Sequence, residues 1–255
     1  KADLYPAKYF VEHNSKLKTA LITANEFNYD MPSDVGEKSI VVTASLGGST
    51  PETVTATGKA KELGAAVISL TMEAGSAITK DADYVIVHGF AKNYAAKLEK
   101  MISALKVAVE VVNQVEGYAN YEQMEDGFEK IPALIEKAAS QVTVQAKQFA
   151  EQYADASQVY VLGSGATAEV AYATSLCLFL EMQWINSASV HSGEFFHGAL
   201  EITDKDVPFV LFMNEGKTRE IDARALTFLQ RFDAKVTVID SKDYGLSSVV
   251  DASVV

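Results

Sequence analysis

Four ionisable side chains lie within 17 residues of one another, and their types could support acid–base chemistry. They are Glu181, His191, Glu194 and His197, and they include half of the chain's four histidines. An apolar run precedes them and glycines separate them. Carboxyl and imidazole groups in partly apolar surroundings are the groups whose pKa shifts and that transfer protons during catalysis. We therefore take residues 181–198 as the candidate acid–base site.

Each of these residues also has a simpler interpretation. Glu181 sits in the apolar sequence Leu-Phe-Leu-Glu-Met-Gln-Trp, where burial would make a carboxyl group hold its proton more strongly and suit it to proton transfer near neutral pH. A solvent-facing position on a helix is the alternative. His197 follows two phenylalanines and could equally be a half-buried histidine bonded to the backbone. The spacing of His191, Glu194 and His197 does not match a helical His-x-x-x-His pair, so no metal site is predicted.

A glycine-rich turn in the first half of the chain is a candidate anion site. The sequence Ser-Leu-Gly-Gly-Ser-Thr at 45–50 follows a β-branched run, and Thr50 and Pro51 are suited to the N-cap and first position of a helix. Free backbone N–H groups and the helix dipole at such a turn favour an anion, most often phosphate. It lacks the Gly-Lys-[Ser/Thr] of a Walker P-loop. An ordinary capped turn is the alternative, and the residues leave both open.

Composition and charge limit the classes of partner. The formal net charge of −12 disfavours binding to a nucleic-acid backbone. No apolar run approaches the ~18 residues of a membrane span, so we expect a protein without membrane or nucleic-acid partners. Cys177 is the only cysteine, which rules out an intrachain disulfide and fits a reducing compartment. We expect a cytoplasmic location.

The elements that must position these residues alternate between strands and helices. Alternation of this kind predicts an α/β fold with parallel sheets. We predict strands at 17–23, 40–44, 65–71, 84–88, 158–162, 187–191, 209–213 and 235–239, and helices at 1–13, 51–63, 92–115, 121–153, 166–182 and 219–231.

The two halves of the chain repeat one pattern: strand, polar turn ending in threonine, helix, strand. Ser45 and Asn214 occupy the same place in the two copies, as do Thr50 and Thr218. The second copy carries Glu215 in its turn, which would repel an anion. We predict a first domain at 1–115, a helical connector at 116–155 and a second domain at 156–255. Matching the copies also predicts a strand and turn before residue 1 and further chain after residue 255, with 248–255 corresponding to 82–87.

Taken together, these motifs resemble the SIS (sugar isomerase) family. They are Ser-x-x-Gly-x-Thr-Pro-Glu-Thr at 45–53, Gly-Glu-Phe-Phe-His-Gly at 193–198, and Glu-Met-Gln-Trp at 181–184. The resemblance covers nearly the whole chain. It is closest to the double-domain branch that contains the isomerase half of glucosamine-6-phosphate synthase and the deglycases of phosphorylated Amadori products, the fructosamine-6-phosphate deglycases in particular.

The resemblance implies roles for eight residues. Glu181 matches the family's catalytic carboxylate, and His197 matches a histidine that can come from the partner of a dimer. Glu194 would support the substrate site. The resemblance places Ser45, Gly47, Ser49 and Thr50 on the sugar 6-phosphate and Ser164 at the sugar. The chain departs from the family at Ala199, where relatives usually have proline, and at Leu46 or Gly47, where many have a polar residue.

The implied reaction opens the ring of a ketoamine sugar phosphate, moves a proton from C1 to C2 and hydrolyses the resulting imine. Its products are glucose 6-phosphate and a free amino acid, and it needs no cofactor or metal. We expect a homodimer or higher homo-oligomer. Two alternatives remain open at this point: aldose–ketose isomerisation or amination of a sugar phosphate, and a non-catalytic phosphosugar sensor.

Overall fold

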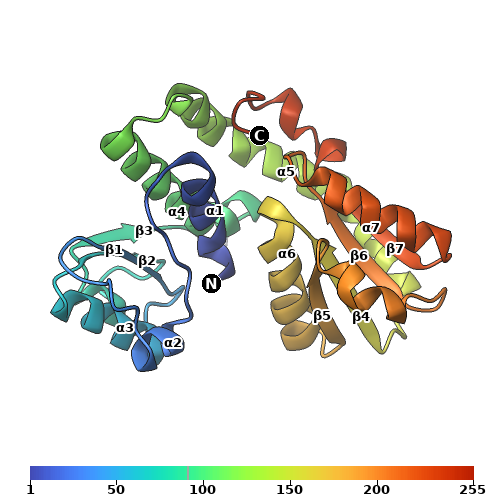
Figure 1. Cartoon of the computed structure of the whole chain (residues 1–255), viewed down its shortest axis with the longest axis horizontal. Coiled ribbons are helices and arrows are strands. Elements are labelled where there is room, and N and C mark those ends of the chain that lie inside the picture. Colours follow the sequence, from blue (N-terminus) through green and yellow to red (C-terminus); the bar gives the residue numbers. More distant parts are fainter. Residues whose placement is uncertain (91) are drawn as a thin grey trace. The chain divides into compact units, whose positions relative to one another are not determined.

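The computed structural model describes residues 1–90 and 92–255 and divides them into two compact units, residues 3–121 and 122–255. Figure 1 shows the elements of both. No helix of the described residues is both long and apolar enough to cross a bilayer.

The first unit is built on a three-stranded parallel sheet. Strands β1 (Ile40–Ala44), β2 (Ala66–Thr71) and β3 (Tyr84–Val87) lie in the order β1-β2-β3. Helices α2 (Ala24–Tyr29) and α3 (Pro51–Glu62) pack together on one face, and α1 (Tyr5–Asn14) packs with α4 (Tyr94–Glu116) on the other (Figure 1). The unit is therefore a three-layer α/β sandwich, and the prediction of an α/β fold with parallel sheets is confirmed for it.

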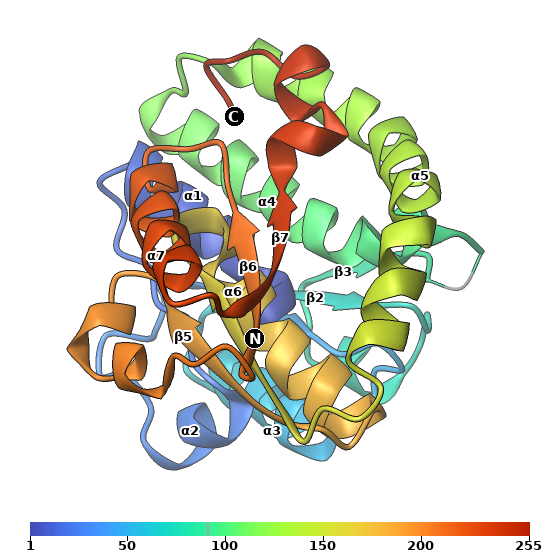
Figure 2. The ribbon, with the colours of Figure 1, turned by 90° about the vertical axis from the view of Figure 1, so that its right-hand side faces the viewer.

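The second unit has a four-stranded parallel sheet in the order β5-β4-β6-β7. A long helix, α5 (Tyr121–Gln152), precedes it and continues through Pro132. One face of the sheet carries α7, and the other carries α6 and a π-helix (Figures 1 and 2). The bounds are β4 (Gln158–Gly163), α6 (Ala168–Ala173), the π-helix (Thr174–Met182), β5 (Asn186–His191), β6 (Pro208–Met213), α7 (Arg219–Arg231) and β7 (Lys235–Asp240).

Side-chain alternation along the strands of the second unit explains why both faces are covered. Phe209 and Leu211 pack with Leu162 in the core under α7, whereas Val210 packs with Val159 in the core under α6 and the π-helix. Successive side chains of a strand point to opposite faces, so a strand that is apolar throughout needs a helix on each side.

Two segments lack the strand that their predictions imply. Residues 17–23 form no strand, and Thr23 instead caps α2, with Glu26 N–H donating to its hydroxyl at 3.2 Å. The matching strand of the second unit, β5, pairs only with β4, and the described part of the first unit has no strand in the place of β4. The second difference is at residues 248–255, which form no strand; Val250 is buried there and lies against Gly127 of α5.

Candidate functional site

The turn from β1 into α3 brings together hydroxyl groups that are five residues apart. Ser45 is 6% exposed, and its Oγ lies 2.9 Å from Thr50 Oγ1. The N–H of Gly48 donates to the Ser45 carbonyl at 3.1 Å and closes the turn. Thr50 stands at the N-cap position of α3 as predicted, but its hydroxyl caps no backbone N–H because it bonds to Ser45 instead.

The backbone of this turn is left with unused donors. Among the described residues, the N–H groups of Gly47, Ser49 and Thr50 donate to no protein acceptor, and Gly47, Ser49 and Thr50 are exposed. These groups lie at the start of a 12-residue helix, where the dipole favours negative charge. The turn therefore has the donors of an anion site.

Gly48 gives the turn its shape. Its φ is +64°, and a Cβ at this position would lie 1.9 Å from Ser76 Oγ and 2.9 Å from Thr71 Oγ1. A side chain would therefore be strained by the backbone and would also collide with its neighbours. Beneath the turn, a hydroxyl contact fastens α3 to the sheet, because Thr57 Oγ1 lies 3.1 Å from Thr43 Oγ1 of β1.

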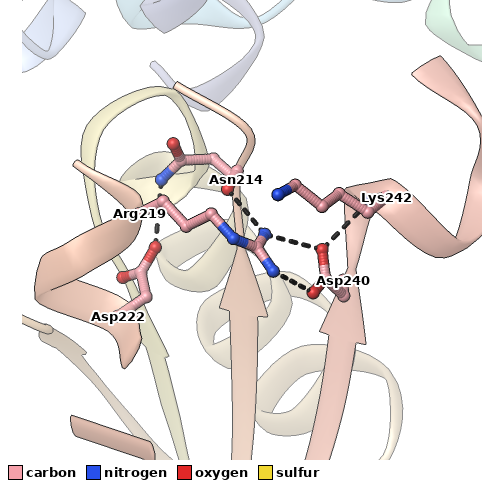
Figure 3. Close-up of polar contacts among 5 residues, drawn as sticks. All are labelled: Asn214, Arg219, Asp222, Asp240 and Lys242. Carbon is pink, nitrogen blue, oxygen red and sulfur yellow. Dashed lines mark hydrogen bonds and ion pairs between the residues drawn. The ribbon is translucent and has the colours of Figure 1, made fainter. Parts of the chain in front are cut away.

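The equivalent turn of the second unit is also closed by a hydrogen bond between two side chains, but an amide replaces one of the two hydroxyls. Asn214 Nδ2 donates to Thr218 Oγ1 at 2.9 Å, as Ser45 bonds to Thr50 in the first unit. Arg219, the first residue of α7, places its guanidinium between Asn214 and Asp240 (Figure 3). It donates to the Asn214 carbonyl at 3.0 Å and to both carboxylate oxygens of Asp240 at 2.8 and 2.5 Å.

This bidentate pair shifts the ionisation of both partners. The hydrogen bonds from Arg219 hold the pKa of Asp240 below its ordinary value, and those to Asp240 raise the pKa of Arg219. The Lys242 N–H adds a further hydrogen bond to Asp240 at 3.0 Å. The one cation at the start of α7 is thus neutralised within the described protein, and Glu215 lies close enough to add negative charge. The turn also carries an exposed cation, Lys217, beside the acidic Glu215, so its charges are mixed, whereas the first unit's turn at 45–50 has no ionisable side chain.

Asp222 is a fully buried carboxyl group behind this turn. Its Oδ2 accepts a hydrogen bond from Asn214 Nδ2 at 3.0 Å, and Figure 3 shows the two side chains facing each other. Burial raises the pKa of Asp222, although the hydroxyls of Ser192 and Ser164 act in the opposite direction. Asp222 was not among the predicted site residues, and the available signal was a single acidic residue on the core-facing side of an amphipathic helix.

Ser164 lies at the carboxyl end of β4, next to β6. The chain leaves β4 toward β5 on one side, and β6 leads to β7 on the other, so this is the topological switch point of the sheet. Ser164 is fully buried, and its hydroxyl donates to the Thr218 carbonyl at 3.2 Å. Because the hydroxyl hydrogen of Ser164 is donated within the second unit, the Ser164 oxygen can only accept a hydrogen bond from a ligand.

Glu181 lies in the last turn of the π-helix and is exposed. Its surroundings are apolar, as predicted: Leu178, Leu180, Met182 and Trp184 are 48%, 39%, 66% and 89% exposed. The burial that we expected for Glu181 is therefore not provided by the second unit. The helix itself also differs from the prediction, because the α-helix expected over 166–182 changes to π geometry at Thr174.

Glu194 and His197 lie in a short 3-10 segment that follows β5. The His197 N–H donates to the Glu194 carbonyl at 2.9 Å, and both side chains are exposed. Phe195 is fully buried between them and anchors the segment in the core under α7. His191 Nδ1 accepts a hydrogen bond from the Gly193 N–H at 3.0 Å, which assigns it a local structural role.

The predicted site residues thus fall into two groups, one in each unit. Ser45, Gly47, Ser49 and Thr50 share the first turn. Ser164, Glu181, Glu194 and His197 belong to elements of the second unit that surround β4 and β5. Among the described residues, no three His, Cys, Asp or Glu side chains are arranged to hold a metal ion.

Comparisons with known proteins agree with this architecture. The SIS domain model matches residues 7–114 and 152–248. Fructosamine deglycase FrlB of Bacillus subtilis (strain 168) is 36% identical over 98% of this chain and 77% of its own length. Fructoselysine 6-phosphate deglycase of Escherichia coli (strain K12) is 24% identical over 92% of this chain and 68% of its own.

Solved structures give the same answer. A crystal structure from Salmonella typhimurium LT2 superimposes with a TM-score of 0.95 at 38% identity, over 98% of this chain and 76% of that one. One from Bacillus subtilis gives 0.93 at 36% identity, over 99% and 77%. The chain belongs to the SIS domain family.

Proposed function

We propose that this protein is a deglycase for 6-phosphorylated Amadori products. Its substrate would be a fructosyl or glucosyl amino acid 6-phosphate, and its products glucose 6-phosphate and the free amino acid. The observation that carries the proposal is the turn at residues 45–50, whose hydroxyls and unused N–H groups suit a phosphate and which has no acidic side chain, whereas the matching turn of the second unit carries Glu215. The deglycase names of the FrlB and fructoselysine relatives support the choice of reaction.

In the proposed reaction Glu181 carries the proton. The open-chain ketoamine loses a proton from C1 to the Glu181 carboxylate and becomes an enaminol. The same carboxyl group returns a proton to C2, which leaves a C1–N imine. Water adds to the imine carbon, the C–N bond breaks, and the amine leaves with a proton. His197 would assist ring opening and the departure of the amine. Substrate and one water account for all atoms of the products, and no electrons are exchanged.

The exposure of Glu181 is consistent with a site completed by other parts of the protein. We propose a homodimer in which a partner helps to cover the apolar surroundings of Glu181. Light scattering of the purified protein tests this, and a monomer that releases glucose 6-phosphate at full rate would contradict it.

The test of the function measures glucose 6-phosphate released from fructoselysine and fructose-asparagine 6-phosphates. Glu181→Gln should lower the rate by about 100- to 10,000-fold, the usual contribution of a general acid–base group. Glu201→Gln, an exposed glutamate in the neighbouring segment, serves as the control and should keep the parental rate. Full activity in Glu181→Gln would show the mechanism to be wrong.

The same assay separates the alternatives. Conversion of fructose 6-phosphate to an aldose phosphate without an amine would favour an isomerase, and dependence on an added amine would favour amination. Binding of sugar phosphate without turnover of any substrate would favour a sensor.

A further inference from the structure

Within residues 1–90 and 92–255, three helices are followed by a strand after a loop of only three residues. The loops are residues 63–65, 183–185 and 232–234, and the middle residue of each has a left-handed backbone. These residues are Gly64, Trp184 and Asp233, with φ of +83°, +58° and +53°. A left-handed residue lets the chain reverse direction directly after a helix.

The helix end before Trp184 is closed by a hydrogen bond that spans more residues than those at the ends of α3 and α7. After α3, the N–H of Ala65 donates to Ala60, and after α7 that of Ala234 donates to Leu229, at 3.2 and 3.1 Å. Both bonds span five residues, as in a Schellman motif.

At the π-helix, the N–H of Ile185 instead donates to the Phe179 carbonyl at 2.9 Å, a span of six residues. The Gln183 N–H donates to Leu178 at 3.0 Å, which is the five-residue bond of a π-turn. Glu181 therefore lies in a turn that holds one residue more.

The wider turn decides which side chains face the core. Ala171, Ser175 and Phe179 recur every four residues and are 1%, 4% and 8% exposed. In an α-helix a four-residue repeat drifts by about 40° at each step. The π-turns that begin at Thr174 contain more residues, so they offset the drift accumulated over α6, and Ser175 and Phe179 stay buried like Ala171. Glu181, two positions beyond Phe179, then faces away from the core.

The backbone of Trp184 is unusual for its residue type. A left-handed conformation is disfavoured for a bulky side chain, and Gly64 shows the residue that such a loop prefers. The indole is 89% exposed, so packing within the second unit does not compensate. A disfavoured conformation kept beside a candidate catalytic residue points to a role in positioning.

We propose that Trp184 is a positioning residue for Glu181. Its left-handed backbone closes the π-turn and sets the direction in which the Glu181 carboxylate leaves the helix. The catalytic part of this inference rests on the proposed function. The geometric part does not, and the experiment measures the two separately.

The experiment is a series of substitutions ordered by their tolerance of a left-handed backbone: Trp184→Gly, →Asn, →Ala and →Val. The Gly and Asn variants should keep kcat within about threefold of the parent. The Val variant should lose about 100-fold in kcat, the scale of a displacement of ~1 Å, with KM unchanged. Amide hydrogen exchange at Gln183 and Ile185 should speed up in the Val variant and should not speed up in the Gly and Asn variants, because a β-branched residue tolerates the left-handed backbone least. If the Val variant does not fold, the β-branched substitution Trp184→Thr takes its place in the comparison with Gly.

Asp233 provides the matched control, because it has the same backbone conformation at the end of α7. Asp233→Val should lower stability and leave kcat unchanged. A parental kcat and a parental rate of amide hydrogen exchange in Trp184→Val would overturn the proposal. Equal losses of kcat in the Gly and Val variants would also overturn it, because they would assign the effect to the loss of the indole. If the parent releases no glucose 6-phosphate, the deglycase proposal fails, and the exchange rates alone decide whether Trp184 holds the π-turn.

Discussion

Single residues of the second unit show how burial and pairing move ionisation in opposite directions. Asp222 is enclosed by the protein and its pKa is raised, whereas Asp240 is held by Arg219 and its pKa is lowered. The first group favours the folded state when it is protonated and the second when it is ionised. The two carboxyl groups therefore predict opposite dependences of stability on pH.

For Asp222, the raised pKa predicts that folding is penalised at neutral pH. Its contribution to stability is fully present below the ordinary value of 3.8 and is lost as pH rises through the higher pKa of the folded state. Asp222→Asn should therefore gain stability relative to the parent as pH increases from 4 to 7. Urea unfolding of both proteins across this range measures the difference, and a difference that is constant with pH would contradict the prediction.

For Asp240, the bidentate contact with a largely buried Arg219 predicts a loss of stability on neutralisation. The side chains are 16% and 22% exposed. Asp240→Asn should cost ~2 kcal/mol, the scale of hydrogen bonds to charged groups. The contribution is present above the ordinary value of 3.8 and is lost as pH falls through the lower folded pKa. Asp206→Asn removes the exposed pair with Lys235 and should change stability by less than ~1 kcal/mol; equal losses would contradict the prediction.

At the level of elements, the turn between β1 and α3 depends on a residue without a side chain. Gly48→Ala adds a Cβ at 1.9 Å from Ser76 Oγ to a backbone with φ of +64°. We expect a loss of ~3 kcal/mol from strain and overpacking, together with weaker phosphate binding. Gly75→Ala shares the positive φ but meets nothing within 4 Å, so it should lose only ~1 kcal/mol. Thermal unfolding compares the two, and similar losses would show that the contact with Ser76 is unimportant.

The elements themselves were largely predictable, and the exceptions have physical causes. Apolar runs and helix ends located β1, β2, β4 and β6, because buried parallel strands have a distinctive composition. Residues 17–23 have similar composition, but a strand needs a neighbour and the described first unit offers none there. The π-turn around Glu181 was not predictable from the sequence. The π-helix is only nine residues long, and apolar residues spaced four apart over so short a segment fit an α-helix equally well.

At the level of the whole molecule, sequence and structure agree on an internal duplication. The pairs Ser45–Thr50 and Asn214–Thr218 were matched by position alone, and each forms a hydrogen bond of 2.9 Å. The network of Arg219, Asp222 and Asp240 was not foreseen, because it joins residues from separate elements that only the fold brings together. The sequence alone therefore located the proposed phosphate site more readily than it explained why the second copy differs.

The duplication predicts that sugar phosphate binds to one copy of the turn. Ser45→Ala should weaken the binding of fructose 6-phosphate by about tenfold, the value of one hydrogen bond near 1.4 kcal/mol. Thr218→Ala changes the second copy and should leave the affinity unchanged. Calorimetric titration measures both, and a loss of affinity in the Thr218 variant would contradict the assignment.

The ion pair between Arg219 and Asp240 also has a consequence for how the sequence can vary. In the second copy the turn is held by residues that serve stability, so selection for folding alone should restrict positions 219 and 240. In the first copy the exposed positions 47 and 49 make no side-chain hydrogen bond within the described protein, so they should vary freely until selection is for growth on the substrate. A mutational library sorted under both selections would show which substitutions each copy tolerates, and it would distinguish the two copies without a structure of a bound ligand.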